Sequence, residues 1–465
     1  MKQGITYLRG VGNYMIPGPE KLSSNIIHLY RFFNDFQKRP LTYLGNYRDT
    51  YGDLLQIRVG DKAAFYIVTH PDYMHEALVK QAHKLEKNND YKNTEHGLAR
   101  FLGTGLLTSD GDLWKRQRKL VAPALHVQRI RAYADVMTQY TDDMLNDWQD
   151  GTRYEIDHEM TRLTLRIVAK TLFNMDAMPV AERVGDAMTT FQTMFDQVDL
   201  IPQWVPTPLH IRVNNAVKVM DEIVYNMIRT RRQNNVDEGD LLSMLLAAQD
   251  EDGSSMSDEQ VRNEAVTLFL AGHETTANTM NWTWYLLSQH PEVESKLHEE
   301  LDTVLVGKLP TLEDLNSLPY TEMVIKESMR LYPPAWMISR YIAEDMTLGG
   351  YTLPKGHELN LPIYFLHRHQ DFWDNPEAFE PERFTPEQEA ERHRYAYMPF
   401  GAGPRICIGN SFAMMEARLL LATIAQRYVL RLEKNQTIEP VPQITMRPSS
   451  LKMKAYLRQP VPVLQ

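Results

Sequence analysis

The chain has 465 residues, of which 43% are hydrophobic and 24% are charged, and its formal net charge is −10. Acidic and basic residues are mixed along the sequence, which disfavours nucleic acid as the main partner. Because the chain contains one cysteine, it cannot form an internal disulfide, and its composition requires no oxidising compartment.

The N-terminal region shows no membrane or export signal. No run of 18 apolar residues occurs, which argues against a membrane-spanning helix, and the first residues lack the apolar core of a signal peptide. We expect residues 1–20 to form a peripheral segment in which Pro17-Gly18-Pro19 is extended. No repeat or domain-length linker interrupts the rest, so residues 1–465 are predicted to form a single domain.

Helical periodicity dominates the chain. Strand-like segments are few, namely 54–59, 64–68 and short pieces after residue 339 and near the C-terminus. This pattern predicts a mainly α protein of the α+β class, with a helical body and a smaller β portion.

Trp114 and Arg118 lie at i,i+4 on one predicted helix face, where both could donate to a carboxylate. A solvated basic face is the simpler interpretation of their neighbours Lys115, Arg116 and Lys119. Those three residues could also form part of a docking surface for an acidic partner, which is a hypothesis.

The longest predicted helix covers residues 258–290. Ser257 is a good N-cap, Gln260 stands where a capping-box partner belongs, and Pro291 ends the pattern. At 1.5 Å per residue this helix would be about 50 Å long, so it must cross the whole body of a globular chain.

The middle of this helix reads Phe269-Leu270-Ala271-Gly272-His273-Glu274-Thr275-Thr276. Gly272 costs about 1 kcal/mol relative to alanine, and the Thr275 hydroxyl can bond to the carbonyl four residues earlier and bend the helix. Taken alone, this is a polar patch on a long helix. Beside a flat cofactor, the same small residues would leave room for a small ligand.

Glu327 and Arg330 share one helix face at i,i+3. Arg383, in Pro381-Glu382-Arg383-Phe384, adds another charge downstream. An exposed pair of this kind contributes only about 0–1 kcal/mol, so the pattern alone is weak evidence for a functional cluster.

Cys407 lies in the run Phe400-Gly401-Ala402-Gly403-Pro404-Arg405-Ile406-Cys407-Ile408-Gly409. A lone cysteine is more often a small buried hydrophobe than a ligand. Here, however, the glycines permit a tight turn and a close backbone approach, Arg405 favours the thiolate, and Phe400 can shield a flat apolar ligand. The loop therefore predicts a thiolate presented to a large, planar, acidic ligand that contains iron, namely haem.

The pattern Phe-x-x-Gly-x-Arg-x-Cys-x-Gly resembles the cytochrome P-450 family, the haem-thiolate monooxygenases. The family's other motifs occur in order from about residue 20 to the end. The resemblance implies the cytochrome P-450 fold, with the long central helix crossing the haem. It also implies a soluble, cytoplasmic, bacterial monomer without a fused reductase, similar to the fatty-acid or alkane hydroxylase-like and microsomal-like branches.

By the same resemblance, Cys407 is the axial ligand of the haem iron. Thr275 would orient water and stabilise the iron-bound oxygen species, Glu274 would help to relay protons, and His273 is expected to be structural. Some fatty-acid ω-hydroxylases carry a glutamate, esterified to haem, at the position of Ala271, which cannot form this bond. We therefore expect noncovalently held haem b.

The resemblance assigns further residues to the cofactor. The donors to the haem propionates would be Trp114, Arg118, Arg340 and Arg405. The residues beside the macrocycle would be Phe400, Ala271 and Gly272. Glu327, Arg330 and Arg383 would form a buried triad that holds the Cys407 loop and takes no part in catalysis.

The family layout builds the substrate pocket from segments 88–108, 191–212, 335–338 and 444–446 and from the central helix. These segments are rich in apolar side chains, and no charged residue obviously anchors a polar substrate, although such side chains are equally common in a core. Residues 201–206 could form an apolar lid. The candidate pocket residues are Phe101, Leu106, Phe191, Trp204, Phe269, Trp336, Met337, Ile338 and Met446.

These observations predict an enzyme that inserts one oxygen atom from O2 into a hydrophobic fatty acid, alkane or terpenoid, using electrons from a separate ferredoxin or flavodoxin system. The alternative is a peroxide-driven haem-thiolate peroxygenase or an isomerase. The pair Glu274-Thr275 argues against this alternative, because those branches often lose it. A haem sensor or carrier would need a linked signalling domain or an exposed haem, and the sequence suggests neither.

Overall fold

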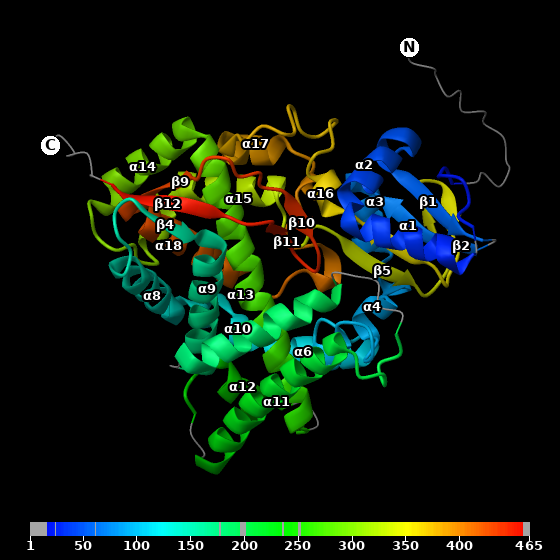
Figure 1. Cartoon of the computed structure of the whole chain (residues 1–465), viewed down its shortest axis with the longest axis horizontal. Coiled ribbons are helices and arrows are strands. Elements are labelled where there is room, and N and C mark those ends of the chain that lie inside the picture. The colour runs from blue at the N-terminus through cyan, green and yellow to red at the C-terminus, as the bar shows by residue number, and fades with distance from the viewer. Residues whose placement is uncertain are drawn as a thin grey trace.

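The computed structural model describes residues 16–23, 25–60, 62–175, 178–195, 201–234, 237–249 and 253–458. Helices surround the central helix α13, strands β1, β2 and β5 lie at one side of the molecule, and β4, β9 and β12 lie at the opposite side (Figure 1). The prediction of a mainly α protein with a smaller β portion is confirmed.

The helix bounds are α1 Ile26–Lys38, α2 Pro40–Tyr51, α3 Pro71–His75, α4 Asn89–Lys92, α5 Ala99–Leu102, α6 Gly111–Val121, α7 Val127–Ile130, α8 Ala134–Asn146, α9 Ile156–Phe173, α10 Met178–Gln192, α11 Pro208–Asn234, α12 Leu241–Ala247, α13 Asp258–Gln289, α14 Pro291–Leu305, α15 Pro319–Leu331, α16 Ile363–Leu366, α17 Pro386–Glu391 and α18 Asn410–Arg427. The strand bounds are β1 Leu54–Val59, β2 Lys62–Val68, β3 Leu85–Glu86, β4 Thr152–Glu155, β5 Ile338–Ile342, β6 Met346–Leu348, β7 Tyr351–Leu353, β8 Glu358–Leu361, β9 Tyr428–Leu432, β10 Pro440–Pro442, β11 Met446–Pro448 and β12 Lys452–Leu457.

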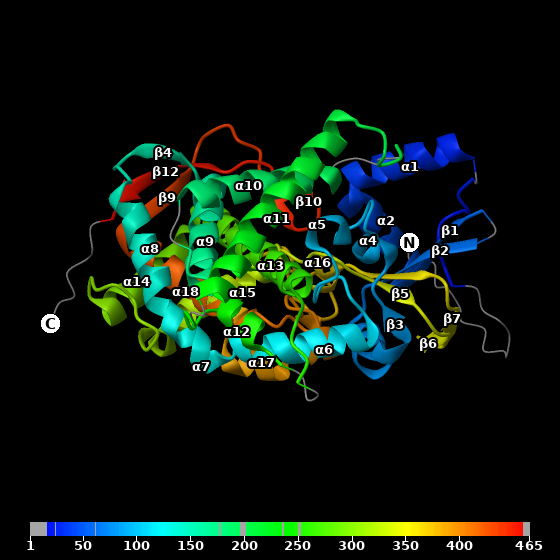
Figure 2. The same cartoon turned by 90° about the horizontal axis from the view of Figure 1, so that it is seen from below.

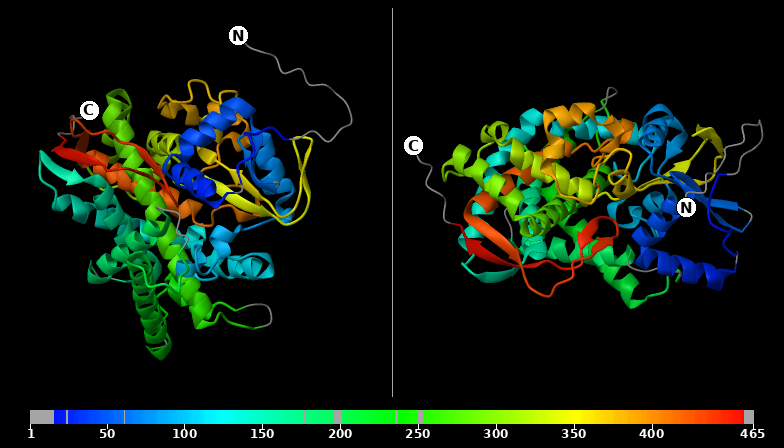
Figure 3. Two further views of the ribbon diagram at one scale, coloured as in Figure 1. Left: turned by 45° about the vertical axis from the view of Figure 1, so that its right-hand side comes forward. Right: turned by 90° about the horizontal axis from the view of Figure 1, so that it is seen from above.

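α13 has 32 residues and crosses the body of the protein, as the two further views in Figure 3 show. The predicted capping box is present: the Gln260 N–H donates to Ser257 Oγ at 3.2 Å, and the Ser257 N–H donates to Gln260 Oε1 at 3.1 Å. The helix ends one residue earlier than predicted, because His290 precedes Pro291 and leaves the helical region with φ −127° and ψ 73°.

Five strands form one sheet in the order β1-β2-β8-β5-β3. β1 has the predicted bounds, whereas β2 begins at Lys62, two residues before the predicted segment. A register shift between Ile57 and Arg58 lets the pairing continue until Val59 lies opposite Lys62. In the same sheet, β5 carries Arg340 opposite Leu359 of β8, so the sheet determines where Arg340 enters the site.

The largest cluster of buried apolar side chains gathers around α13 and receives residues from α9, α11, α15 and α18. α9 packs along α13, and α8 and α18 pack against each other beside them (Figure 2). A second cluster lies around the five-stranded sheet. Among the described residues, no helix combines the length and apolar character needed to cross a bilayer.

Candidate active site

The loop before α18 presents Cys407. Gly401 and Gly403 have φ values of 73° and 70°, in the left-handed region that favours glycine. A Cβ atom on Gly403 would lie 1.9 Å from the carbonyl oxygen of Leu78, so the loop approaches this backbone too closely for a larger residue. The Cys407 N–H donates to the Phe400 carbonyl at 2.9 Å, which closes the turn.

Cys407 is accessible and yet lies within the protein. Its surface is exposed, but desolvation by the surrounding chain raises the pKa of the thiol, against the opposing effects of the Gly409 N–H and of Arg118. A side chain that is both accessible and desolvated faces an enclosed space. This is a suitable position for a thiolate that binds a buried cofactor.

α13 contributes further accessible residues to the interior. Every residue between positions 261 and 284 is buried except Ala271, which is exposed, and Gly272 and Thr275, which are partly exposed. Thr275 Oγ1 donates to the Ala271 carbonyl at 2.8 Å, as expected from the sequence. Because the helix is enclosed on both sides of this stretch, these residues face an internal space.

Gly272 also has a packing role that the sequence did not indicate. A Cβ atom at this position would lie 3.1 Å from Val168 Cγ2 on α9. Part of the need for a small residue at Gly272 therefore comes from the close approach of α9 to α13.

Arg405 joins several elements at the edge of this space. It pairs with Asp110, and its guanidinium Cζ lies 4.3 Å from the centroid of the Trp114 ring. Its Nη1 atom is buried and has no hydrogen-bond partner. Desolvation, together with the nearby charges of Arg340 and Arg118 and against the effect of Asp110, lowers the pKa of Arg405 to about 10.

Three more cations lie close to Arg405, and burial desolvates each of them. Desolvation lowers the pKa of Arg118 and of Arg340. It also holds the pKa of Lys87 well below its ordinary value, with Arg340 and Arg405 acting in the same direction. Among the described residues, Asp110 is the carboxylate that opposes the shifts of Lys87, Arg340 and Arg405, whereas Cys407 opposes that of Arg118.

This cluster fits the carboxylates of a haem. The Asp110 carboxylate, which opposes the pKa shifts of the desolvated Lys87, Arg340 and Arg405, also pairs with Lys92. One Arg405 donor is left without a partner, so an anion at this place would relieve the mutual repulsion of the cations. The sequence analysis proposed Trp114, Arg118, Arg340 and Arg405 as donors to the cofactor, but it did not include Lys87 and Asp110, which the structure places beside them. No local pattern marks these two residues, because their role depends on charges brought near them by folding.

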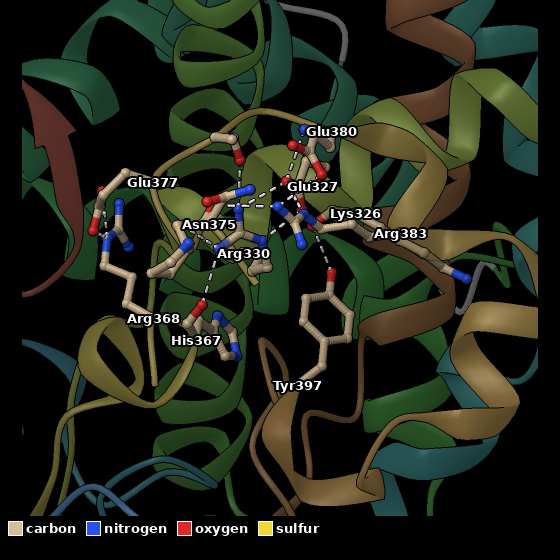
Figure 4. A network of polar contacts seen from close by, with 12 residues as sticks. Lys326, Glu327, Arg330, His367, Arg368, Asn375, Glu377, Glu380, Arg383 and Tyr397 are labelled. Carbon is tan, nitrogen blue, oxygen red and sulfur yellow. Dashed lines mark hydrogen bonds and ion pairs between the residues drawn. The ribbon is translucent and has the colours of Figure 1, made fainter. Parts of the chain in front are cut away.

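The structure brings Glu327, Arg330 and Arg383 together (Figure 4). Arg330 Nε and Nη2 donate to the two Glu327 carboxylate oxygens at 2.6 and 2.8 Å. Arg383 Nε lies 3.5 Å from Glu327 Oε1. Arg330 also donates to three backbone carbonyls, those of His367, Pro376 and Ala378.

His367 links this cluster to the Cys407 loop, and sequence reasoning missed it. Its carbonyl accepts from Arg330 at 3.0 Å, and its ring Nε2 accepts from the Met398 N–H at 2.9 Å. The Met398 carbonyl in turn accepts from the Gly401 N–H at 3.0 Å. Desolvation, with Arg330 and Arg368 nearby, lowers the pKa of His367 to about 3, so its ring is neutral and keeps an acceptor nitrogen.

Several candidate pocket residues pack against one another in the interior. Phe101 and Phe191 are fully buried and stack with their ring centroids 4.3 Å apart. Phe269 is also buried, but it stacks on Phe173 of α9 at 5.1 Å. Phe269 is therefore part of the packing between α9 and α13.

The remaining candidates divide between the interior and the surface. Trp336 is buried and donates from Nε1 to the Gln443 carbonyl at 2.8 Å, and Met446 is fully buried. Leu106, Met337 and Ile338 are partly exposed. Trp204 is 84% exposed, and residues 201–207 are all exposed or partly exposed, so the structure places Trp204 at the surface instead of in a pocket.

The Cytochrome P450 family model matches residues 17–455. The chain is 36% identical over 425 residues to the cyclooctatin synthase of Streptomyces melanosporofaciens, with 90% of this chain and 91% of that protein covered. It is 34% identical over 430 residues to the pentalenene oxygenase of Streptomyces avermitilis, with 91% and 94% covered. Its fold is similar to that of the retinoic acid-bound cyanobacterial CYP120A1, with a TM-score of 0.83, 22% identity, and 96% and 100% of the two chains covered. The chain therefore belongs to the cytochrome P450 family, whose members are haem-thiolate oxidoreductases.

Proposed function

We propose that this protein is a haem-thiolate monooxygenase that inserts one oxygen atom from O2 into a hydrophobic terpenoid. The observation that carries the proposal is Cys407, which is accessible within an enclosed space and lies close enough to Arg118 for the two charges to interact. That arrangement suits a thiolate ligand beneath an anionic cofactor. Within the wider classes of hydrophobic substrate, the names of the two Streptomyces relatives favour terpenoids over fatty acids and alkanes.

The residues present would hold haem b without a covalent bond. Cys407 would bind the iron, and Trp114, Arg118, Arg340 and Arg405 would bind the propionates, with Lys87 adding positive charge. Phe400 and Ala271 would border the macrocycle. When bound, the haem supplies O2 binding and activation, and thiolate ligation favours O–O cleavage.

The chain itself supplies proton handling and exclusion of water. Thr275 Oγ1 is bonded to the Ala271 carbonyl, so its oxygen keeps lone pairs with which to order a water molecule in the accessible stretch of α13. Glu274, one residue earlier and 7% exposed, would pass protons towards that water. The buried apolar side chains around α13 would keep other water out.

Electrons would come from a separate ferredoxin or flavodoxin with its reductase. Lys115 is exposed and lies on α6, the helix that carries Trp114 and Arg118. Arg116 is less suited to docking than expected, because its guanidinium lies 3.4 Å from Gln260 Oε1 and 3.2 Å from Ser254 Oγ. Lys115 is therefore the better candidate for contact with an acidic partner.

The proposal is tested by the carbon monoxide difference spectrum of the reduced holoprotein. A Soret band at the position typical of thiolate ligation is expected, and a band typical of imidazole ligation would refute the role of Cys407. A panel of terpenoids, fatty acids and alkanes is then added to the ferric protein, and a spin shift identifies the substrate class. Incorporation of ¹⁸O from ¹⁸O2 with NADPH and a ferredoxin system separates a monooxygenase from a peroxide-driven enzyme.

A further inference from the structure

Glu274 is held by a residue from a distant part of the chain. Thr445 Oγ1 donates to Glu274 Oε1 at 2.5 Å, across 171 positions of sequence. Glu274 is 7% exposed and Thr445 is 8% exposed, so little water competes with this bond. The second carboxylate oxygen, Oε2, is buried and has no hydrogen-bond partner. Of the two Glu274 oxygens, Oε1 is therefore hydrogen-bonded and Oε2 is not.

Asn278 orients the Thr445 hydroxyl. Its Nδ2 atom donates to Thr445 Oγ1 at 3.0 Å, and Asn278 is 6% exposed. A threonine hydroxyl has one hydrogen. Because Thr445 Oγ1 accepts from Asn278, its own hydrogen is free to point at the Glu274 carboxylate. Glu274 and Asn278 lie at i,i+4 on α13, so the Thr445 hydroxyl lies between two neighbours on one helix face.

The loop that carries Thr445 is tied to α13 and to the segment before β5. Trp282 Nε1 on α13 donates to the Met446 carbonyl at 3.1 Å. The Met446 N–H donates to the Pro334 carbonyl at 2.9 Å, and Trp336 Nε1 donates to the Gln443 carbonyl at 2.8 Å. Three backbone groups on either side of Thr445 are thus held by buried partners, which fixes the position of its hydroxyl.

His273, the residue before Glu274, does not hold the Glu274 carboxylate. His273 Nδ1 is 2.8 Å from the Phe269 carbonyl on its own helix, and the ring is 2% exposed. Burial lowers the pKa of His273, so its ring is neutral and remains bound to that carbonyl. Thr445 is accordingly the residue whose side chain determines which Glu274 oxygen is bonded.

We propose that Thr445, oriented by Asn278, is a positioning residue that holds Glu274 Oε1 and leaves Oε2 as the oxygen that exchanges protons with water. This inference rests on the proposed function, because it assigns a mechanism to the Glu274 of a monooxygenase. It also links proton delivery to the loop that places Met446 beside Trp282 and Trp336. A substrate that displaces this loop would disturb Glu274, whereas one that packs against it would leave Glu274 in place.

The experiment compares the wild type with Thr445→Val, Thr445→Ser, Glu274→Gln and the double variant Thr445→Val/Glu274→Gln. Thr283→Val is a matched control. Thr283 is buried on α13, the helix that carries Glu274, and its hydroxyl donates to the Thr279 carbonyl on the same helix at 2.7 Å. Each holoprotein receives NADPH, a ferredoxin and its reductase in air, without organic substrate. Reduction of O2 to H2O2 takes two electrons and two protons, and reduction to water takes four of each. The consumption of NADPH and O2 and the yield of H2O2 therefore give the ratio of the two products.

Thr445→Val should raise the ratio of H2O2 to water by about threefold or more, because the proton-relaying carboxylate is no longer held. Glu274→Gln should also raise the ratio of H2O2 to water. The double variant should give a ratio no higher than that of Glu274→Gln alone, because both changes act through the Glu274 carboxylate. Thr445→Ser and Thr283→Val should resemble the wild type. A double-mutant cycle on urea unfolding of the same proteins should detect coupling between positions 445 and 274 independently of turnover.

The outcomes separate the two proposals. A wild-type holoprotein whose carbon monoxide difference spectrum lacks the thiolate band would overturn the proposed function and this inference with it. If the wild type is active, two results would overturn the positioning role alone. One is an unchanged ratio of H2O2 to water in Thr445→Val. The other is a double variant in which the effects of Thr445→Val and Glu274→Gln on this ratio add. Failure of Thr445→Ser to restore the wild-type ratio would also contradict it.

Discussion

Arg330 and Glu327 lie one turn apart on α15 and form an ion pair in which both side chains have 0% exposure. The pair is bidentate, and Arg330 makes three further bonds to backbone carbonyls of the segment 367–378. The Arg330 guanidinium also lies 5.0 Å from the centroid of the Trp373 ring. A charge pair this well bonded ties the segment 367–378 to α15.

Glu327→Ala and Arg330→Ala should each destabilise the holoprotein by about 3–5 kcal/mol, because each leaves a buried charge without its partner. The expected result is a loss of haem-containing protein on expression, measured as haem per polypeptide. Arg162→Ala is the control, since its i,i+3 pair with Glu159 is 49% exposed on the arginine side and should contribute at most about 1 kcal/mol. Normal haem incorporation in both α15 variants would refute the bracing role of the cluster.

His367→Leu should weaken the hold on the Cys407 loop, because the Met398 N–H loses its acceptor at a buried position. An unsatisfied buried donor costs about 1–3 kcal/mol, and we expect faster transfer of haem to an excess of apomyoglobin. His367→Asn keeps an acceptor and should be milder. His298→Leu removes a neutral histidine from α14, where its pKa is lowered to about 4, and should not change haem transfer. Equal transfer rates in His367→Leu and His298→Leu would contradict this prediction.

Glu416→Gln should stabilise the protein increasingly as the pH rises. Glu416 is fully buried on α18, and desolvation raises the pKa of its carboxyl from 4.5 to about 8, against the effect of the Thr276 hydroxyl. Between these two values the folded protein holds a proton that the unfolded chain releases, so this group lowers stability as pH rises, by about 1.4 kcal/mol per unit at most. Glutamine carries no charge and removes this dependence.

The measurement for Glu416→Gln is urea unfolding of the holoprotein at pH 5 and pH 8. The stability of the variant relative to the wild type should be greater at the higher pH. Glu313→Gln serves as the control, because the Glu313 side chain is 73% exposed and its replacement removes no desolvated group. A difference between Glu416→Gln and the wild type that is the same at both pH values would show that Glu416 is ionised in the folded protein throughout.

Acidified butanone should extract the haem completely. Ala271 is the exposed residue at the centre of α13, and its methyl group cannot form an ester with the macrocycle. The check is the haem absorbance of the protein phase and the organic phase after extraction. Haem that stays with the polypeptide would refute noncovalent binding.

Lys115→Glu should slow turnover driven by NADPH and a ferredoxin, while turnover driven by peroxide should stay unchanged. The Lys115 side chain is 68% exposed and its ammonium lies 2.9 Å from Asp112 Oδ1, so reversal of its charge alters the surface without removing an interior contact. Asp112→Lys is the matched control, because it replaces a negative charge by a positive one and the Asp112 side chain is 97% exposed. Equal losses in both assays would indicate a folding defect instead of weakened docking.

The features that depend on neighbouring residues could be predicted from the amino-acid sequence. The capping box of Ser257 and Gln260, the bond from Thr275 to Ala271, the glycine turn before Cys407 and the pairing of Glu327 with Arg330 each span at most a few positions. Helical periodicity and backbone sterics act over the same range. For that reason the long helix, the fold class and the glycine turn before Cys407 could all be predicted.

Which distant groups meet depends on how the helices and strands pack together. Lys87 and Asp110 join Arg405 because β3, α6 and the loop before α18 fold to one place, and His367 reaches Met398 in the same way. The family layout of the pocket segments predicted Trp204 as a pocket residue, but the structure places it at the surface. Thr445 reaches Glu274 across 171 positions, and no sequence period encodes such a contact. Burial and charge at these sites are properties of the packed chain, since they depend on how much water the assembled elements exclude.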